Sequence, residues 1–336
     1  MVRFFFFFTF LLIIVIFLLY LRKEAPLKES FPSSPLWGFA LDGFPIDQVR
    51  IEQIQNEAGS NPQIISFFLQ WSQEEIYQKM LVDTLQSIWT YGAVPSLTWE
   101  PFTFDGHQKN AVPYIDVLNG KYNHYLLQMA QTIKVFGKPL IIRFAHEMNL
   151  NIYHWGTTEE EYGYKSPEIY IKMYRYVVNQ FKEFGVKNIL WAFCPNAGSV
   201  PDELWNKIEG YYPGDDYVDI LGMDGYAWSS VPIQTFQEIF ETTYKSLKQI
   251  SKKKPIIVFE TAIGGEQKTK IEWLKAAVNI AKDWKLAGLI WFQVDKELDW
   301  RILTQNNSSE IRQILSSSQN WATFVLKDVE FQETSF

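Results

Sequence analysis

Short apolar runs recur along the chain, and longer stretches with helical spacing follow them. The runs cover residues 36–43, 64–71, 93–101, 139–148, 188–196, 219–226, 255–263 and 287–295. Most are nearly continuous in apolar residues, which is typical of parallel strands that are covered on both faces. The pattern therefore predicts eight buried strands that run in parallel.

The stretches between these runs carry the signals of helices. Residues 166–185 begin with Ser166 as the expected N-cap and Pro167 in the first turn, and they stop at Gly185. Residues 121–137 and 269–284 show similar three- and four-residue spacing of apolar side chains. Eight strand-then-helix units predict an α/β fold, a (β/α)8 TIM barrel. The competing doubly wound sheet would usually show a glycine-rich first turn, and none is present.

The amino terminus departs from this pattern. Residues 4–21 are almost wholly apolar, which is long enough for a helix to span a hydrocarbon core of roughly 30 Å. We therefore predict an N-terminal hydrophobic helix before the barrel, which anchors the protein in a membrane or is cleaved on secretion. Either outcome predicts an extracytoplasmic location. The expected segments are a signal anchor or signal peptide (1–23), a Pro- and Ser-rich linker (24–35), the barrel domain (36–316) and a C-terminal tail (317–336).

Charge and cysteine content narrow the possible partners. The formal net charge of −7 argues against nucleic acid, because phosphate binding requires a basic face. Cys194 is the only cysteine and no metal-binding motif is present, so we expect no disulfide within the chain, no metal and no cofactor. The 13 Trp and 17 Tyr residues fit either a large aromatic core or platforms for sugars. We expect a monomer.

Polar residues that close the strands are the candidates for a site, because ligands bind at the C-terminal ends of barrel strands. Alternation along the fourth and seventh runs places two sets of side chains on one face each: Ile141, Arg143, Ala145 and Glu147, and Ile256, Val258 and Glu260. If both faces point inward, Glu147 and Glu260 meet across the mouth of the barrel. The sixth run adds Asp224 and Tyr226, and the eighth adds Trp291, Gln293 and Asp295.

Two opposed carboxyl groups beside aromatic rings are the parts that glycoside hydrolysis requires. One carboxyl group donates a proton to the leaving oxygen, and the other stays ionised and attacks the anomeric carbon. Burial raises the pKa of the first, whereas a cation such as Arg143 lowers the pKa of the second. Alternation alone does not choose the pair, because Glu100, Asp42 and Asp224 are further candidates. A Glu that ends a strand is also often a solvated loop residue or a capping partner.

The motifs at the strand ends resemble those of glycoside hydrolase family 26. They are RFAHEMN followed by YHWG, YYPGDDYVDILGMDGY (211–226), KPIIVFETA (254–262) and GLIWFQVD (288–295), with less specific support from LTWEP. The resemblance implies a TIM barrel and a retaining enzyme that acts on a β-linked polysaccharide. It implies either β-1,4-mannan or mixed-linkage β-1,3-1,4-glucan as the substrate.

The resemblance also assigns roles to residues. It implies that Glu147 is the acid/base and Glu260 the nucleophile, that His146 shapes the site and Tyr226 hydrogen-bonds the nucleophile, and that Trp291 is the floor under the sugar. We expect further substrate contacts from Arg143, Asp224, Trp99 and Trp155. A retaining mechanism predicts carboxyl groups about 5–5.5 Å apart.

The segment MNLNIYHWG departs from the mannan-cleaving pattern. Leu150 stands where those members have Gly, and Tyr153 and His154 stand where they have a run of Trp. This segment is more similar to the mixed-linkage glucanase side of the family. The alternative function is a membrane-tethered, non-catalytic protein that binds glycans or helps to assemble polysaccharide.

Overall fold

The computed structural model describes residues 36–316, apart from residues 60, 73, 105–107, 157–162, 229–231 and 304–308. The predicted signal segment (1–23), linker (24–35) and tail (317–336) lie outside the described residues. Within the described ranges, none of the helices combines the length and the apolar character needed to cross a membrane.

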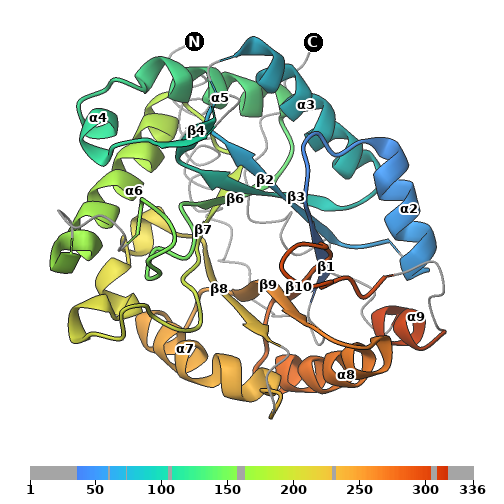
Figure 1. Ribbon diagram of the computed structural model, residues 1–336. Coiled ribbons are helices and arrows are strands. Elements are labelled where there is room, and N and C mark those ends of the chain that lie inside the picture. The colour runs from blue at the N-terminus through green and yellow to red at the C-terminus, as the bar shows by residue number, and fades with distance from the viewer. Residues whose placement is uncertain are drawn as a thin grey trace, which may run out of the picture. The chain divides into compact units, whose positions relative to one another are not determined.

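Eight parallel strands close into a barrel at the centre of the fold (Figure 1). Their order around the barrel is β1-β10-β9-β8-β7-β6-β3-β2, so each strand pairs with neighbours on both sides. Every predicted apolar run supplies one strand, which confirms the predicted (β/α)8 TIM barrel. The strands are β1 (Leu36–Leu41), β2 (Ile64–Gln70), β3 (Val94–Glu100), β6 (Leu140–Phe144), β7 (Ile189–Phe193), β8 (Ile220–Ala227), β9 (Ile256–Ile263) and β10 (Gly288–Phe292).

Helices surround the barrel and cover the outer faces of its strands (Figure 1). They are α2 (Gln48–Ala58), α3 (Glu75–Thr90), α4 (Tyr114–Leu118), α5 (Asn123–Phe136), α6 (Ser166–Glu183), α7 (Phe236–Ile250), α8 (Gln267–Asp283) and α9 (Ser309–Ser316). Short 3-10 turns are η1 (Gly163–Lys165), η2 (Leu204–Asn206), η3 (Ile208–Tyr211) and η4 (Asp215–Tyr217). A small antiparallel hairpin, β4 (Phe102–Phe104) and β5 (Lys109–Ala111), directly follows β3.

One helix start differs from the prediction. Ser166 is the first residue of α6 and not its N-cap, because η1 leads into the helix and places Lys165 at the cap position. The Ser166 hydroxyl is buried and makes no hydrogen bond in the part of the chain that the structure describes. The other two predicted helices, residues 121–137 and 269–284, correspond to α5 and α8, and their boundaries agree within a few residues.

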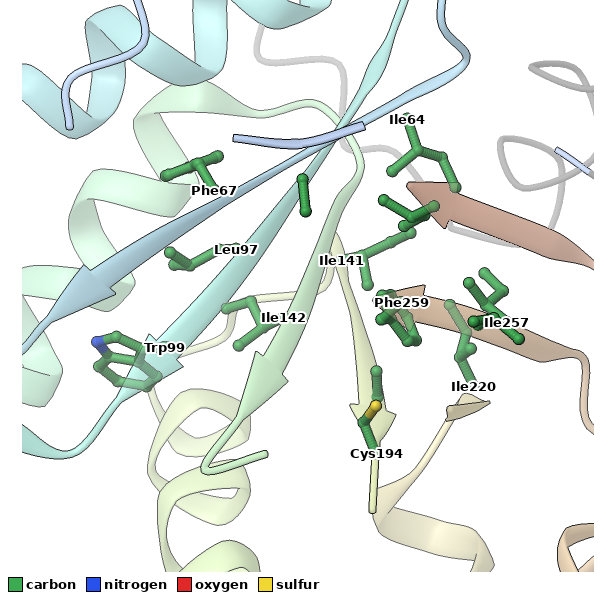
Figure 2. Packing of buried hydrophobic residues seen from close by; sticks show 14 of the residues in the cluster. Ile64, Phe67, Leu97, Trp99, Ile141, Ile142, Cys194, Ile220, Ile257 and Phe259 are labelled. Carbon is green, nitrogen blue, oxygen red and sulfur yellow. The ribbon is translucent and has the colours of Figure 1, made fainter. Parts of the chain in front are cut away.

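Side chains alternate between the barrel interior and the helix layer. Trp99 of β3 and Phe144 of β6 are register partners, and both pack outward against aromatic side chains of α5 and α6. Arg143 points inward from the position next to Phe144, because its guanidinium meets Thr98 of β3. Figure 2 shows Trp99 and Ile142 on the face of their strands that is turned toward the helices. Phe259 lies on the opposite, interior face of the barrel. Burial of both faces explains why the strands read as continuous apolar runs.

Two irregularities break the alternation at the ends of strands. β6 ends at Phe144, and the next residues include Ala145 and Glu147 with φ of +48° and +51°. Non-glycine residues rarely take this left-handed conformation, and strain of this kind clusters at functional sites. In β9, Val258 pairs with Met223 but Glu260 pairs with Asp224, so Phe259 is an extra residue in a β-bulge.

Candidate active site

Arg143 is the cation at the centre of the barrel mouth. It is fully buried, and its Nε and Nη2 donate to Thr98 Oγ1 at 3.1 and 2.7 Å. The remaining guanidinium donors bond Asp224 and Glu260. Burial lowers the pKa of Arg143, but the charges of the two carboxyl groups more than reverse that effect and raise it. The guanidinium therefore stays charged and holds both acidic side chains by charge-assisted hydrogen bonds.

Glu260 is held at both carboxylate oxygens. Arg143 donates to Oε1, and the Tyr226 hydroxyl donates to Oε2. The side chain is almost wholly buried, so these contacts replace the water that would otherwise solvate a negative charge. Both donors leave the carboxylate fixed in orientation. This is the environment that an attacking carboxylate requires.

Glu147 lies near enough to Glu260 to feel its charge, but its own surroundings differ. It is almost wholly buried, and its Oε1 accepts a hydrogen bond from Asn196 Nδ2 at 2.6 Å. Burial first, and then the charge of Glu260, raise the pKa of Glu147 to about 7, although hydrogen bonds from Asn196 and Tyr153 oppose the rise. A carboxyl group with this pKa carries a proton in much of the population at neutral pH and is able to give it away.

Asp224 is the second carboxyl partner of Arg143 and the register partner of Glu260 on the neighbouring strand. It is fully buried, and burial raises its pKa even though Arg143 opposes the rise. Because it does not reach the surface, Asp224 serves to hold the guanidinium rather than to meet a sugar. The predicted substrate contacts of Asp224 and Arg143 thus become supporting contacts to the nucleophile candidate.

His146 lies beside Asp224 and Glu260 in its neutral form. Burial, with the charge of Arg143 next, lowers the pKa of His146 well below its usual range. The ring faces Tyr153 at 5.0 Å and Phe68 at 6.4 Å between centroids. Its Nδ1 is buried without a hydrogen-bond partner among the described residues. The ligating atoms of His146, Asp224 and Glu260 lie within 4.8 Å of one another, but a metal ion there would have to displace the Arg143 guanidinium.

Trp155 supports the site from behind. Its Nε1 donates to the backbone oxygen of His146 at 2.8 Å, and its ring stacks on Tyr153 at 4.5 Å between centroids. Only 6% of Trp155 is exposed. The structure thus places Trp155 where it positions His146 and Tyr153, and its predicted contact with a substrate stays a prediction.

Two of the expected aromatic contacts are not at the mouth. Trp99 faces the helix layer and is fully buried, with its Nε1 donating to the Tyr125 hydroxyl at 3.0 Å. Trp291 also faces outward, toward Trp273 of α8, and its Nε1 donates to Trp300 O at 2.8 Å. Its neighbour Phe292 takes the inward position and packs on Tyr226 at 5.5 Å. The structure therefore does not bring Trp99 or Trp291 to the carboxyl pair.

Three residues of the site escaped the sequence analysis. Asn196 follows β7 and bonds Glu147, and the rule that drew attention to strand ends would have found it. Asn149 joins the loops after β6 and β7, because it accepts from Asn196 N at 2.9 Å and donates to Asn196 O at 3.0 Å. Trp300 packs on Tyr226 at 5.2 Å, but it comes from a loop beyond β10 where no periodic pattern marks it.

A separate surface hollow of about 440 Å³ lies on the outer side of α6. Its walls include Lys165, Glu168, Lys172 and Arg175, and it contains none of the residues described above at the barrel mouth. One carboxyl group that is already paired with Lys172 does not supply the two carboxyl groups of glycosidase acid/base chemistry. The barrel mouth is therefore the candidate active site.

The sequence matches the model of glycosyl hydrolase family 26 over residues 53–291. It is 32% identical to endoglucanase H of Acetivibrio thermocellus over 277 residues, which are 77% of this chain and 28% of that protein. It is 28% identical to a mannan endo-1,4-beta-mannosidase of Bacillus subtilis over 206 residues, 54% of this chain and 51% of the relative. The chain thus spans about half or less of the length of these relatives.

Solved structures share the fold at low sequence identity. A Cellulomonas fimi endo-beta-1,4-mannanase double mutant superposes with a TM-score of 0.67 at 17% identity, over 88% of this chain and 74% of that one. Bacillus subtilis mannanase man26 gives 0.61 at 19% identity, over 83% and 86%. At these identities the likeness concerns the barrel fold.

Proposed function

The chain belongs to glycosyl hydrolase family 26, and on that premise we propose that it is a retaining glycoside hydrolase that cleaves a β-linked polysaccharide by double displacement. One observation carries the proposal. At the barrel mouth Glu147 lies near enough to Glu260 to feel its charge and has a pKa of about 7, whereas Glu260 is bonded by Arg143 and Tyr226. Two carboxyl groups with opposed environments are what acid and nucleophile roles require.

The first displacement joins the sugar to the enzyme. The carboxyl group of Glu147 gives its proton to the glycosidic oxygen, while the carboxylate of Glu260 attacks the anomeric carbon. The bond from that carbon to the leaving oxygen breaks, and an ester bond to Glu260 forms. Tyr226 and Arg143 hold Glu260 in line for this attack.

The second displacement releases the sugar. Glu147, now a carboxylate, takes a proton from water as the water oxygen attacks the anomeric carbon. The ester bond to Glu260 breaks and the product leaves with its β configuration retained. Once Glu260 is esterified its negative charge is gone, so the pKa of Glu147 falls and Glu147 is the better base in this step.

The proposed substrates are β-1,4-mannan and mixed-linkage β-1,3-1,4-glucan. The names of the relatives above refer to mannan and to glucan, and the barrel domain is the part that this chain shares with them. The Leu150 and Tyr153 departures from the mannanase motif favour the glucan. Because a polysaccharide does not cross a membrane, we also propose that the barrel acts outside the cytoplasm, tethered or secreted through the predicted segment at residues 1–23.

Purified full-length protein incubated with β-mannan, barley-type β-glucan, β-1,3-xylan and cellulose tests the proposal. We expect release of reducing ends from one of the first two, and proton NMR of the first product formed should show the β anomer. Glu260→Ala should abolish turnover and keep measurable binding, whereas Glu272→Ala on the outer face of α8 should behave like the parent. Binding by the parent protein without release of reducing ends would instead favour the non-catalytic glycan-binding protein.

A further inference from the structure

Glu100 is a third acidic side chain at the barrel mouth, and the two displacements do not use it. It is the last residue of β3, two positions beyond Thr98, whose hydroxyl holds Arg143 inside the barrel. Alternation along the strand therefore points Glu100 to the same interior. Its register partner on β2 is Gln70, so two polar residues end these neighbouring strands.

The backbone around Glu100 is fixed to the loop that follows Glu147. His154 Nε2 lies 2.9 Å from the backbone oxygen of Pro101, and the ring of Phe102 stacks on Trp155 at 6.4 Å with an interplanar angle of 6°. Trp71 N donates to Phe102 O at 2.9 Å on the other side. A side chain on such a support has a defined position, as contacts to a substrate require.

The carboxyl groups of Glu100, Glu147 and Glu260 all lie close enough to Tyr153 to influence its hydroxyl. The charges of all three act on the Tyr153 hydroxyl, and their combined effect, after that of burial, raises the pKa of Tyr153. Glu100 also feels the charge of Glu260 directly. Glu100 as a whole is half-buried and so keeps some exposed surface at the end of β3.

Within the described ranges, the Glu100 carboxyl has neither an ion pair nor a hydrogen bond. The cation with the largest effect on the pKa of Glu100 is Lys109 of the hairpin. Its ammonium group, however, lies over the Phe102 ring, 4.6 Å from the ring centroid. Burial raises the pKa of Glu100 to about 7, and Lys109 offsets only part of that rise. A partly desolvated carboxyl group without a partner costs folding free energy, and groups with perturbed pKa values are concentrated at functional sites.

We propose that Glu100 is a substrate-binding residue that accepts hydrogen bonds from hydroxyl groups of a sugar held in the mouth of the barrel. This inference rests on the proposed function, because it deepens the recognition of the same polysaccharide. Sugar hydroxyls are donors that a carboxylate accepts well, and the bound sugar supplies the partner that the protein leaves out. The mouth then has one carboxyl group for binding in addition to the two for chemistry.

Binding measured without turnover tests the role of Glu100. In a Glu260→Ala background, Kd for a hexasaccharide of the hydrolysed polysaccharide is compared for Glu100, Glu100→Gln and Glu100→Ala. We expect Glu100→Ala to weaken binding roughly 10- to 100-fold, the loss that accompanies removal of a hydrogen bond to a charged group. Glu100→Gln keeps the shape and one acceptor, so its loss should be smaller. Glu272→Gln, an exposed carboxyl on α8, is the matched control and should change nothing.

The same substitutions in the active protein complete the test. We expect KM to rise by a similar factor with thermal unfolding midpoints no lower than that of the parent. Normal hydrolysis by the parent together with unchanged Kd and KM in both Glu100 variants would overturn this inference alone. Failure of the parent to bind or cleave any β-glycan would overturn the proposed function, and this inference with it.

Discussion

Asn196 donates a hydrogen bond from Nδ2 to Glu147 Oε1 over 2.6 Å, and it does so from the loop that follows the neighbouring strand. Asn149 fixes that loop through two hydrogen bonds with the Asn196 backbone. Tyr153 donates a second hydrogen bond to the Glu147 carboxyl. Both donors favour the carboxylate, whereas burial and the charge of Glu260 favour the protonated acid. The pKa of about 7 is the balance of these opposed effects.

Removal of either donor should shift the pH dependence of activity. Asn196→Ala and Tyr153→Phe each delete a contact that lowers the pKa of Glu147, so that pKa rises above about 7. Because the protonated form is active in the first displacement, the alkaline limb of kcat/KM moves to higher pH, by roughly one unit. The measurement is kcat/KM from pH 5 to 9. Tyr164→Phe, at an exposed tyrosine on η1, is the control, and unchanged limbs in both test variants would contradict the assignment of Glu147.

The raised pKa of Glu147 also predicts a dependence of stability on pH. The unfolded chain ionises this carboxyl near 4.5 and the folded protein near 7, so the folded state binds the proton more tightly. Ionisation of the buried group therefore lowers the free energy of unfolding as pH rises through this window, by on the order of 3 kcal/mol. Glu147→Gln removes the charge. We expect it to stabilise the protein at pH 8 and to have little effect at pH 5, as measured by urea unfolding.

The control for that measurement is Glu272→Gln, because its carboxyl is exposed on α8. It should shift the urea midpoint equally little at both pH values. A Glu147→Gln variant that is less stable than the parent at pH 8 would show that the buried carboxylate is compensated by its hydrogen bonds.

The barrel could be predicted from the sequence because parallel strands covered on both faces have a simple sequence pattern. Each strand is a short apolar run, and each run was found. Some of the site residues at the barrel mouth could also be predicted, from the rule that sites lie at the C-terminal ends of barrel strands. That rule brought together Arg143, Glu147, Asp224, Tyr226 and Glu260, which the structure places in contact or in charge interaction.

Strict alternation of side chains along a strand did not predict the correct face where the backbone is irregular. Phe259 and Glu260 are consecutive, yet the Arg143 guanidinium lies over the Phe259 ring at 5.6 Å and bonds Glu260. An uninterrupted strand would send these two side chains to opposite faces, and only the bulge in β9 allows both to point inward. Trp291 shows the same limit, because its inward orientation was inferred without knowledge of the register of β10. Trp300 belongs to a loop whose path depends on tertiary contacts.

Gly222 makes room for this bulge, and its substitution should disturb the nucleophile candidate. A Cβ at this position would lie 2.7 Å from Phe259 Cδ2 and 2.9 Å from Cys194 Cβ. We expect Gly222→Ala to lower the free energy of unfolding by roughly 1–3 kcal/mol, as for other overpacked cores. Because Phe259 precedes Glu260, kcat should fall as well. Urea unfolding and kcat measure the two effects. Gly210→Ala, whose Cβ would make ordinary contacts, should be neutral, and parent-like stability of Gly222→Ala would contradict this packing argument.

Arg143 offers the last test, because it joins stability to catalysis. It bonds Asp224 and Glu260 deep in the barrel, so Arg143→Met leaves two carboxyl groups without their cation. We expect a loss of about 3–5 kcal/mol in the free energy of unfolding at pH 7. Arg143→Lys keeps the charge but lacks the planar fork that reaches both carboxyl groups and Thr98, so its stability and kcat should fall between those of the parent and Arg143→Met.

Adding Asp224→Asn to Arg143→Met removes one uncompensated charge and should restore part of the stability without restoring kcat, because Glu260 still lacks its donor. A double-mutant cycle on urea unfolding measures this coupling. Additive effects of the two substitutions would mean that the ion pair does not act as a unit.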